Sequence, residues 1–533
     1  MQIARIGDGA AEQYAAELVG NKAANLARVA ALGLPVPPAF VLPIGLCAAS
    51  LGGDAAAAQS LADGLTEGIE FLENTTGKRF ADQRRPLLVS VRSGAAQSMP
   101  GMLDTVLNVG CTSAAVRGLI RMTGHPRFAG DCRRRFLESY GGVVLGIDPA
   151  AFTAKRNQLV AAEGVDNERA LDCEALERLA AAYEEVIEDD GHVLSEDPME
   201  QLKAAAQAVF GSWLSDRACS YRKLAHLEHL QGTAVTVQAM VFGNAGASSG
   251  AGVAFSRDPS TGLAQPVIEV LFESQGEDVV SGGHNPETEA AIARSLPEVA
   301  AQLREALRRL EHDFGDMQDV EFTIENGKLW ILQTRAGKRT PRAALRLAID
   351  FVNEGRIAPA EALRRLNGLH QRSLTTKRLL AAAAPVGRGV GASAGVAVGR
   401  TAFDPDSANR LAASGDPVIL VRPDTTTADV SGFAVSAGIV TAIGGRTAHA
   451  ALVARQMAKP CVVGCAELAV DVTGHCARLG GVAIKEGDWL SIDGEAGTIF
   501  LGRAKVISER PEAELAEVER WRHSLRSATS STS

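Results

Sequence analysis

Two hydrophobic periods alternate along the first 340 residues, which indicates a mixture of helices and strands. The segment "GNKAANLARVAALG" (residues 20–33) has Leu26, Val29, Ala30 and Leu32 at helical spacing and ends at Gly33, so it predicts a helix. Short apolar runs bounded by turn residues predict strands in "PLLVSVRSG", "TAVTVQAMVFGN" and "GAGVAFSRDPSTG". Between about 150 and 215 the pattern is helical and charged.

The rest of the chain falls into three further sections. Residues 341–385 are rich in Ala, Arg and Leu and predict a helical linker. Residues 386–505 open with the Gly/Ala segment "GRGVGASAGVAVGR" and then alternate strands with short helices. Residues 506–533 begin as a charged helix and end in "SATSSTS", which predicts a disordered tail. The predicted fold class is therefore a mixed α/β and α+β multi-domain chain with sections 1–340, 341–385, 386–505 and 506–533.

Composition narrows the class of protein without naming a function. A chain of 533 residues exceeds a single hydrophobic core. Its 46% hydrophobic content and net charge of −9 argue against a nucleic-acid partner. No apolar run is long enough to span a bilayer, and "MQIARIGDGA" lacks the pattern of a secretory signal. The eight cysteines are irregularly spaced, and the closest pair, Cys461 and Cys465, lies in an apolar run typical of packing. We expect a reduced cytoplasmic protein with no membrane partner.

One histidine lies in a segment that suits an anion. The order "GIVTAI", "GG", "RTAHAALVAR" and "KPCVVG" predicts a strand, a tight turn, a helix and a second strand. His449 then lies in the first turn of the helix, where unpaired N–H groups and the helix dipole favour a phosphoryl group. Arg446 and Arg455 could neutralise its charge. The alternative is a solvent-facing or capping histidine.

A second segment, "DMQDVEFTIENGKLWILQTR" (residues 316–335), predicts a β-hairpin. A two-residue turn at Asn326-Gly327 would leave Gln333 on the opposite face from Glu321. A three-residue loop at 325–327 would instead place four polar side chains on one face: Asp319, Glu321, Gln333 and Arg335. Such a face suits a magnesium–polyphosphate site, because Mg²⁺ prefers oxygen ligands and Arg pairs with phosphate. The alternative is a solvated sheet face with an ion pair.

Several of these segments resemble one known family. "GGRTAHAALVARQMAKPCVVG" (444–464) is similar to the phosphohistidine segment of the enzymes that use phosphoenolpyruvate. "LLVSVRSGAAQSMPGMLDTVLN" and "ESQGEDVVSG", with the segments above, resemble the ATP-grasp nucleotide domain of the dikinase branch in the same order. The resemblance implies an ATP-grasp domain over 1–340, a helical linker, and a swivelling β/β/α phosphohistidine domain over 386–505.

The resemblance also assigns roles to individual residues. His449 becomes the phosphocarrier, and Thr447 occupies a position that is a regulatory phosphorylation site in some dikinases. Arg446 stands where dikinases usually have methionine, Ala448 replaces a serine or cysteine, and Glu273 stands where asparagine is expected. The remaining roles are contacts to ATP by Lys22, Arg92, Gly101, Met102, Asp319 and Arg335, charge neutralisation by Arg135, and Mg²⁺ binding by Glu321 and Gln333.

The implied activity is that of a dikinase-like phosphotransferase. ATP, with Mg²⁺ as cofactor, would phosphorylate His449, and the phosphoryl group would pass to an acceptor, which is pyruvate or phosphoenolpyruvate in the family. Inorganic phosphate is a candidate co-substrate, and a homodimer is common among relatives. The chain is expected to be a short form without the family's C-terminal barrel, so a separate protein would bind the acceptor. The alternatives are a kinase for another small-molecule or protein acceptor, and an ATP-binding regulator without transfer.

Overall fold

The structure is a computed structural model divided into two compact units. One unit contains residues 1–249 and 323–334, and the other contains 250–322 and 335–533. The predicted section 1–340 is thus shared between them. The structure describes residues 3–7, 9, 13–97, 99, 102–280, 286–369, 374, 376–380, 384–425, 429–446 and 448–530.

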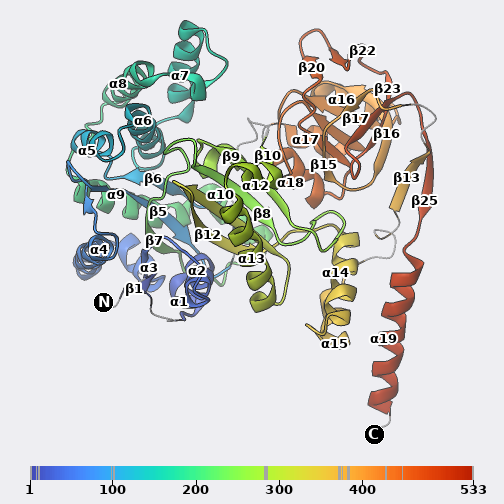
Figure 1. Ribbon diagram of the computed structural model, residues 1–533, viewed down its shortest axis with the longest axis horizontal. Coiled ribbons are helices and arrows are strands. Elements are labelled where there is room, and N and C mark those ends of the chain that lie inside the picture. Colours follow the sequence, from blue (N-terminus) through green and yellow to red (C-terminus); the bar gives the residue numbers. More distant parts are fainter. Residues whose placement is uncertain are drawn as a thin grey trace. The chain divides into compact units, whose positions relative to one another are not determined.

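The first unit contains one five-stranded sheet and a set of α-helices (Figure 1). Its strand order is β1 (Ala4–Ile6), β2 (Ala39–Leu42), β7 (Ala234–Ala239), β5 (Val89–Gly94) and β6 (Thr105–Val109), all antiparallel. A small pair joins β3 (Arg79–Phe80) to β4 (Pro86–Leu87). The helices are α1 Ala16–Val19, α2 Asn21–Ala31, α3 Gly45–Leu51, α4 Ala55–Thr76, α5 Ser113–Thr123, α6 Pro126–Val143, α7 Pro149–Glu163, α8 Cys173–Asp189, α9 Pro198–Gly211 and α10 Asp216–Leu224.

Local sequence explains several of these elements. The predicted helix in residues 20–33 is confirmed as α2, and Gly33 after it has φ 72°, which glycine adopts easily. Asp54 caps α4 by accepting the N–H of Ala56. Every residue of β7 is buried, as expected for a central strand covered on both faces. The strands predicted in residues 86–94, 233–244 and 250–262 are confirmed.

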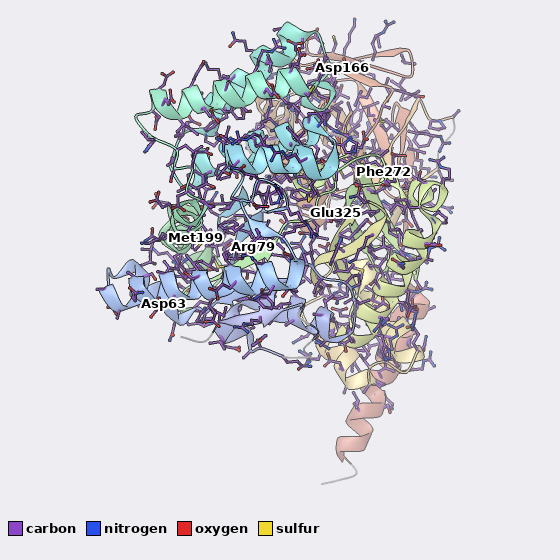
Figure 2. The ribbon with its side chains drawn as sticks, turned by 60° about the vertical axis from the view of Figure 1, so that its left-hand side comes forward. Asp63, Arg79, Asp166, Met199, Phe272 and Glu325 are labelled. Atoms are coloured by element: carbon purple, nitrogen blue, oxygen red, sulfur yellow. The ribbon has the colours of Figure 1, made fainter. Side chains whose placement is uncertain are left out.

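The second unit begins with a five-stranded sheet whose last two strands also extend into the first unit. The order is β10 (Glu287–Thr288), β9 (Val267–Phe272), β8 (Gly250–Phe255), β11 (Gln318–Glu325) and β12 (Lys328–Ala336). Phe272 and Glu325, labelled in Figure 2, mark the ends of β9 and β11. The helices of this part are α11 Gly276–Val280, α12 Glu289–Ser295 and α13 Pro297–Phe314.

The predicted helical linker is helical only in its first part. Helices α14 (Pro341–Asn353) and α15 (Pro359–Arg365) confirm the pattern, but β13 (Thr376–Leu380) is a strand that pairs antiparallel with β25 (Lys505–Glu509). The helical prediction was wrong at β13 because its partner strand is distant in sequence, and strand formation depends on such partners.

Helix α19 extends over Glu512–Ser530 and confirms the charged helix predicted at the start of section 506–533. It continues into the first residues of "SATSSTS", where disorder was predicted, and residues 531–533 lie outside the described residues. Val518 and Trp521 are buried in one cluster with Leu345 and Leu366. Burial of these apolar side chains stabilises the predicted helix.

The section that carries His449 is a sheet with a layer on each face. Its strand order is β14 (Gly387–Arg388), β24 (Thr498–Leu501), β23 (Trp489–Asp493), β16 (Val396–Ala402), β17 (Val418–Arg422), β18 (Gly438–Thr441), β19 (Cys461–Val463) and β15 (Val390–Ser393). Strands β16 to β19 are parallel to one another. The helices are α16 Pro405–Ala413, α17 Val430–Val435 and α18 His449–Gln456, and a smaller sheet contains β20 Leu468–Asp471, β21 Cys476–Leu479 and β22 Val482–Lys485.

Alternation along β17 shows how the layers pack. Val418 and Leu420 join a cluster with Phe433 of α17, whereas Ile419 and Val421 join a cluster with Leu479 of the smaller sheet. Because successive side chains of a strand point to opposite faces, helices cover one face and the smaller sheet covers the other. This section is drawn in orange to red in Figure 1.

The cysteines and helices agree with the compositional expectations. All eight cysteines are free thiols, and Cys461 and Cys465 are fully buried, as the packing interpretation predicted. In the part of the chain that the structure describes, no helix combines the length and apolar character needed to cross a membrane.

Candidate active site

His449 is the first residue of α18, at the position the sequence predicted. The chain leaves β18, passes Gly444 with φ 113°, and enters the helix after Ala448. Few residues other than glycine adopt this backbone conformation, which explains the glycine in the turn. Thr447, the predicted regulatory residue, lies outside the described residues.

One ring nitrogen of the His449 imidazole is buried. The side chain is half-buried, and its Nδ1 is buried without a hydrogen-bond partner among the described residues. The ring also packs edge-to-face on Phe433, with 6.3 Å between centroids. With Nδ1 buried, Nε2 is the candidate ring nitrogen for a reaction with a substrate.

Asp424 is a neighbour of His449 that the sequence analysis missed. Burial raises the pKa of Asp424, while the backbone N–H of Thr425 and the nearby His449 act in the opposite direction. The signal that could have found it is topological. Strands β17 and β18 are adjacent and parallel, so the residues that follow them meet at one edge of the sheet. Asp424 follows β17, and the turn with His449 follows β18.

Arg455 has a different role from the predicted charge neutralisation. It is almost fully buried, and its Nη1 and Nη2 donate to the carbonyls of Ala392 and Arg446 at 2.8 and 2.5 Å. Its guanidinium also lies over the ring of Phe255. Burial lowers the pKa of Arg455, and nearby Glu269 opposes this. Arg455 thus fixes the main chain of the turn before His449.

An acidic face on β11 and β12 contains three of the predicted ATP and metal residues. Nε of Arg335 donates to Oδ2 of Asp319 at 2.8 Å, and Nη2 of Arg335 lies 3.8 Å from Oε1 of Glu321. Oδ1 of Asp319 is buried and has no hydrogen-bond partner among the described residues. Burial raises the pKa of Asp319, and the guanidinium of Arg335 only partly offsets it.

The route by which Arg335 reaches this face differs from the expected one. The structure has a two-residue turn, because β11 ends at Glu325 and β12 begins at Lys328, and Asn326 and Gly327 have φ 50° and 75°. The three-residue loop was therefore wrong. A two-residue turn alone would put Arg335 on the opposite face from Asp319.

The end of β12 departs from simple alternation. Burial alternates as far as Gln333, and then both Gln333 and Thr334 are buried. Arg335 nevertheless meets Asp319 and Glu321, as its contacts with both carboxylates show. The face of Gln333, which lies where the alternation ends, is not fixed by the pleat, so its role as a metal ligand stays a prediction.

In the first unit, Lys22 and Arg92 come from two segments in close contact. The N–H of Asn21 donates to the carbonyl of Ala95 at 2.8 Å. A side chain at Gly20 would come within 2.0 Å of the carbonyl oxygen of Gly94, so glycine is required there. The start of α2, with Lys22, is thereby held against the end of β5, which carries Arg92.

The two side chains differ in their surroundings. Lys22 is exposed, whereas Arg92 is half-buried and forms no ion pair with any residue that the structure describes. A half-buried guanidinium without a carboxylate partner suits an anionic ligand. The expected contacts of Lys22 and Arg92 with ATP phosphates stay predictions.

Arg135 lies in a closed charge cluster on α6. It is buried, and its Nε donates to Oδ2 of Asp131 at 2.9 Å, while Nη2 of Arg134 donates to Oδ1 of Asp131 at 2.7 Å. Arg133 instead pairs with Glu184. These contacts give Arg135 a structural function, and its role in charge neutralisation stays a prediction.

The loop that contains Gly101 and Met102, two of the predicted ATP contacts, is described only in part. Met99 is buried, and Met102, whose N–H donates to the carbonyl of Met99 at 3.2 Å, packs against the core of the first unit. Gly101, expected to offer its N–H to ATP, lies outside the described residues. The predicted ATP contact of Met102 stays untested.

Comparison with known proteins identifies the family. The family described as "Pyruvate phosphate dikinase, AMP/ATP-binding domain" matches residues 54–299 and 288–355, which together make up more than half of the chain. The chain belongs to the pyruvate phosphate dikinase family. A second family, "PEP-utilising enzyme, mobile domain", matches residues 415–497, which include His449.

Individual relatives agree with this assignment. The chain is 40% identical to the pyruvate, phosphate dikinase of Rhizobium meliloti over 98% of its own length and 60% of the relative. It is 40% identical to that of Clostridium symbiosum over 96% and 59%, and 40% identical to pyruvate, phosphate dikinase 1, chloroplastic, of Arabidopsis thaliana over 96% and 53%. The chain thus spans little more than half the length of these dikinases.

Proposed function

We propose that this protein is a dikinase-like phosphotransferase in which ATP phosphorylates His449 and the phosphoryl group then passes to an acceptor. The observation that carries the proposal is the position of His449 at a helix start, half-buried and with Nδ1 buried, which leaves Nε2 as the candidate nucleophile. A nucleophile needs an accessible lone pair, and a helix start stabilises the negative product. Membership of the dikinase family supports this function.

In the proposed step, the lone pair of Nε2 attacks a phosphorus atom of ATP, an N–P bond forms, and the P–O bond to the leaving nucleotide breaks. Attack at the β-phosphorus releases AMP, and attack at the γ-phosphorus releases ADP. The imidazole proton on Nδ1 need not move during the attack. Asp424 is the nearby carboxylate that would balance positive charge on the ring.

The nucleotide would be held by basic side chains and a metal ion. We propose that Lys22, Arg92 and Arg335 pair with its phosphates and that Arg135 neutralises charge in the transfer. Mg²⁺ would neutralise phosphate charge and align the reacting oxygen atoms. The donor set fits such an ion, because Asp319 and Glu321 are hard oxygen ligands and Oδ1 of Asp319 lacks a hydrogen-bond partner among the described residues.

Membership of the family supports the broader frame of the proposal. Residues 386–505 would be a β/β/α domain that swivels, and the paired strands β13 and β25 form its entry and exit. Pyruvate or phosphoenolpyruvate, and inorganic phosphate, are the substrates proposed from the names and family of the relatives. A cytoplasmic location, a separate acceptor-binding protein, a homodimer and regulation at Thr447 stay predictions.

Labelled ATP tests the function. Full-length protein is incubated with Mg²⁺ and ATP that carries label on the β- or the γ-phosphate, beside a His449→Ala variant. We expect acid-labile, base-stable label on the wild type alone, with AMP released. Added inorganic phosphate should then remove γ-label and leave β-label on the protein.

Other outcomes separate the alternatives. Release of ADP with γ-label alone would make the protein a simple kinase for another acceptor. Bound ATP without any protein label would contradict the carrier function and favour an ATP-binding regulator.

A further inference from the structure

Three side chains from separate connections converge beside the smaller sheet of the section that carries His449. Asp404 directly precedes α16, His475 lies between β20 and β21, and Glu486 lies between β22 and β23. Oε2 of Glu486 and Oδ2 of Asp404 lie 2.7 and 3.4 Å from Nδ1 of His475. These three atoms all lie within 4.8 Å of one another. None of the three residues belongs to the site of phosphoryl transfer proposed above.

The separations are close to those of ligands around one metal ion. Zn²⁺ binds imidazole nitrogen and carboxylate oxygen at about 2.0–2.2 Å. Two ligands at that distance lie about 3.0 Å apart for a right angle at the ion and about 3.4 Å apart in a tetrahedral site. The observed distances from Nδ1 of His475 are 2.7 and 3.4 Å. One ion therefore fits with only a small shift of the side chains.

Each carboxylate uses its other oxygen to bind a different part of the same section. Oδ1 of Asp404 accepts the N–H of Ser407 at 2.7 Å, as part of the cap of α16. Oε1 of Glu486 accepts from Nη2 of Arg410 at 2.7 Å. The two remaining oxygens are thus held in fixed orientations toward His475. Ligands that are already fixed lose less entropy when they bind an ion.

The main chain also fixes His475. The N–H of Glu486 donates to the carbonyl of His475 at 3.2 Å, so the two connections that carry these residues are joined. His475 itself has φ 48°. A left-handed backbone is uncommon for residues other than glycine and is found most often in turns and at ligand sites. The position of the imidazole is therefore determined by the fold.

A hydrogen bond does not account for the contact between His475 and Glu486. Oε2 of Glu486 is buried and has no hydrogen-bond partner among the described residues, although Nδ1 of His475 is only 2.7 Å away. A single N–H at Nδ1 serves at most one of the two carboxylates that face it. A metal ion in place of this proton binds all three atoms and supplies the partner that the buried oxygen lacks.

We propose that Asp404, His475 and Glu486 form a divalent metal site that joins the smaller sheet to the start of α16. One nitrogen and two oxygen ligands favour Zn²⁺ or a similar transition metal over Mg²⁺, because Mg²⁺ prefers oxygen ligands alone. Three protein ligands leave a fourth position for water. The site is distinct from the proposed Mg²⁺ site on β11 and β12, and its test does not depend on the proposed function.

Equilibrium dialysis of full-length, chelator-treated protein against Zn²⁺ tests the site, with excess Mg²⁺ present to occupy sites made of oxygen ligands. The wild type should bind one equivalent of Zn²⁺ tightly. Asp404→Asn, His475→Ala and Glu486→Gln should each bind this equivalent at least about 100-fold more weakly, because loss of a residue that merely orients a metal ligand already costs about 10–100-fold.

Two of the substitutions preserve the local contacts. The side chain in Asp404→Asn still caps α16, and that in Glu486→Gln still offers an oxygen to Arg410. His192→Ala is the matched control, because His192 lies 3.4 Å from one exposed carboxylate, that of Asp190, and this variant should bind Zn²⁺ as the wild type does. Absence of tight binding in the wild type, or equal binding in all variants, would overturn the site.

Hydrogen exchange and NMR locate the ion. Zn²⁺ should slow the exchange of backbone amides in residues 473–477 and 484–488 in the wild type and in His192→Ala, but not in Glu486→Gln. In protein with ¹⁵N-labelled histidine, Zn²⁺ should bind Nδ1 of His475. Zn²⁺ bound at another histidine, without a change of exchange in these two segments, would overturn the proposal and leave His475 as an ion-paired side chain.

Discussion

Two clusters of arginine and carboxylate side chains differ in how completely they are paired. On α6, Oδ1 of Asp131 accepts from Arg134, and Oδ2 accepts from Arg135 and from Asn244. On β11 and β12, Oδ2 of Asp319 accepts from Arg335, but the buried Oδ1 has no partner among the described residues. The first cluster is closed by the protein, whereas the second leaves a carboxylate oxygen for a ligand.

The pKa values of the two aspartates are shifted in opposite directions from the ordinary value of 3.8. Burial raises the pKa of Asp131, but the guanidiniums of Arg135 and Arg134 outweigh burial and hold the pKa well below its ordinary value of 3.8. Burial raises the pKa of Asp319, and Arg335 does not compensate it fully. The same residue types thus form a structural cluster when fully paired and a candidate cation site when one charge is in excess.

Asp131→Asn should have the largest effect on stability. The variant leaves the buried guanidiniums of Arg134 and Arg135 without a charged partner, which costs about 3–5 kcal/mol. Urea unfolding, monitored through the hydrogen exchange of peptides from α6, measures the loss of stability. Glu67→Gln, which removes the exposed pair with Arg5, is the control, with an expected change below about 1 kcal/mol. An equally small change in Asp131→Asn would mean that the cluster is not closed.

The stability difference should also depend on pH. Because the folded pKa of Asp131 is depressed, its stabilising contribution is complete above the unfolded value of 3.8 and is lost as the pH falls below it. The gap between wild type and Asp131→Asn should therefore be constant from neutral pH down to about pH 5 and then narrow. The same urea titrations at several pH values measure this. A gap that widens on acidification would contradict the assigned pKa direction.

Glu321→Gln should affect activity rather than stability. It removes one proposed Mg²⁺ ligand and should slow the labelling of His449 about 100-fold, while the urea midpoint changes little because its 3.8 Å pair with Arg335 is weak. Glu325→Gln is the matched control on the same strand, since Glu325 accepts the N–H of Phe242 and a glutamine oxygen can do the same. Equal labelling rates in both variants would show that Glu321 is not a metal ligand in the cluster on β11 and β12.

The smallest expected effect concerns backbone strain directly after β9. Glu273 is exposed, directly follows β9 and has φ 52°, a conformation that asparagine adopts more readily than glutamate. Glu273→Asn should therefore stabilise the unit by about 0.5 kcal/mol without a change in labelling rate. Urea unfolding measures the gain. A slower labelling rate would show instead that Glu273 takes part in nucleotide binding, outside both clusters.

The sequence predicted elements whose determinants are local. The helix start at His449 follows from the two glycines and the apolar pattern around them, and α2 follows from its helical spacing and Gly33. Asp319, Glu321 and Arg335 do share a face. The reason given for it failed, because the turn between β11 and β12 has two residues and not three.

Residues with distant partners were harder to interpret. The strand β13 was predicted as helix because its partner β25 lies far along the chain. Arg455 was expected near a phosphoryl group, but it donates to the carbonyls of Ala392 and Arg446. Asp424 could have been found from the rule that ligand sites form beyond the carboxyl ends of parallel strands.

The nitrogen of His449 that carries the phosphoryl group is the most direct test of the central claim. Protein with ¹⁵N-labelled histidine is incubated with Mg²⁺ and ATP, and NMR identifies the phosphorylated ring nitrogen. Because Nδ1 is buried, we predict a phosphoryl group on Nε2 of His449. Phosphorylation at Nδ1, or at another residue while His449 stays unmodified, would contradict the account.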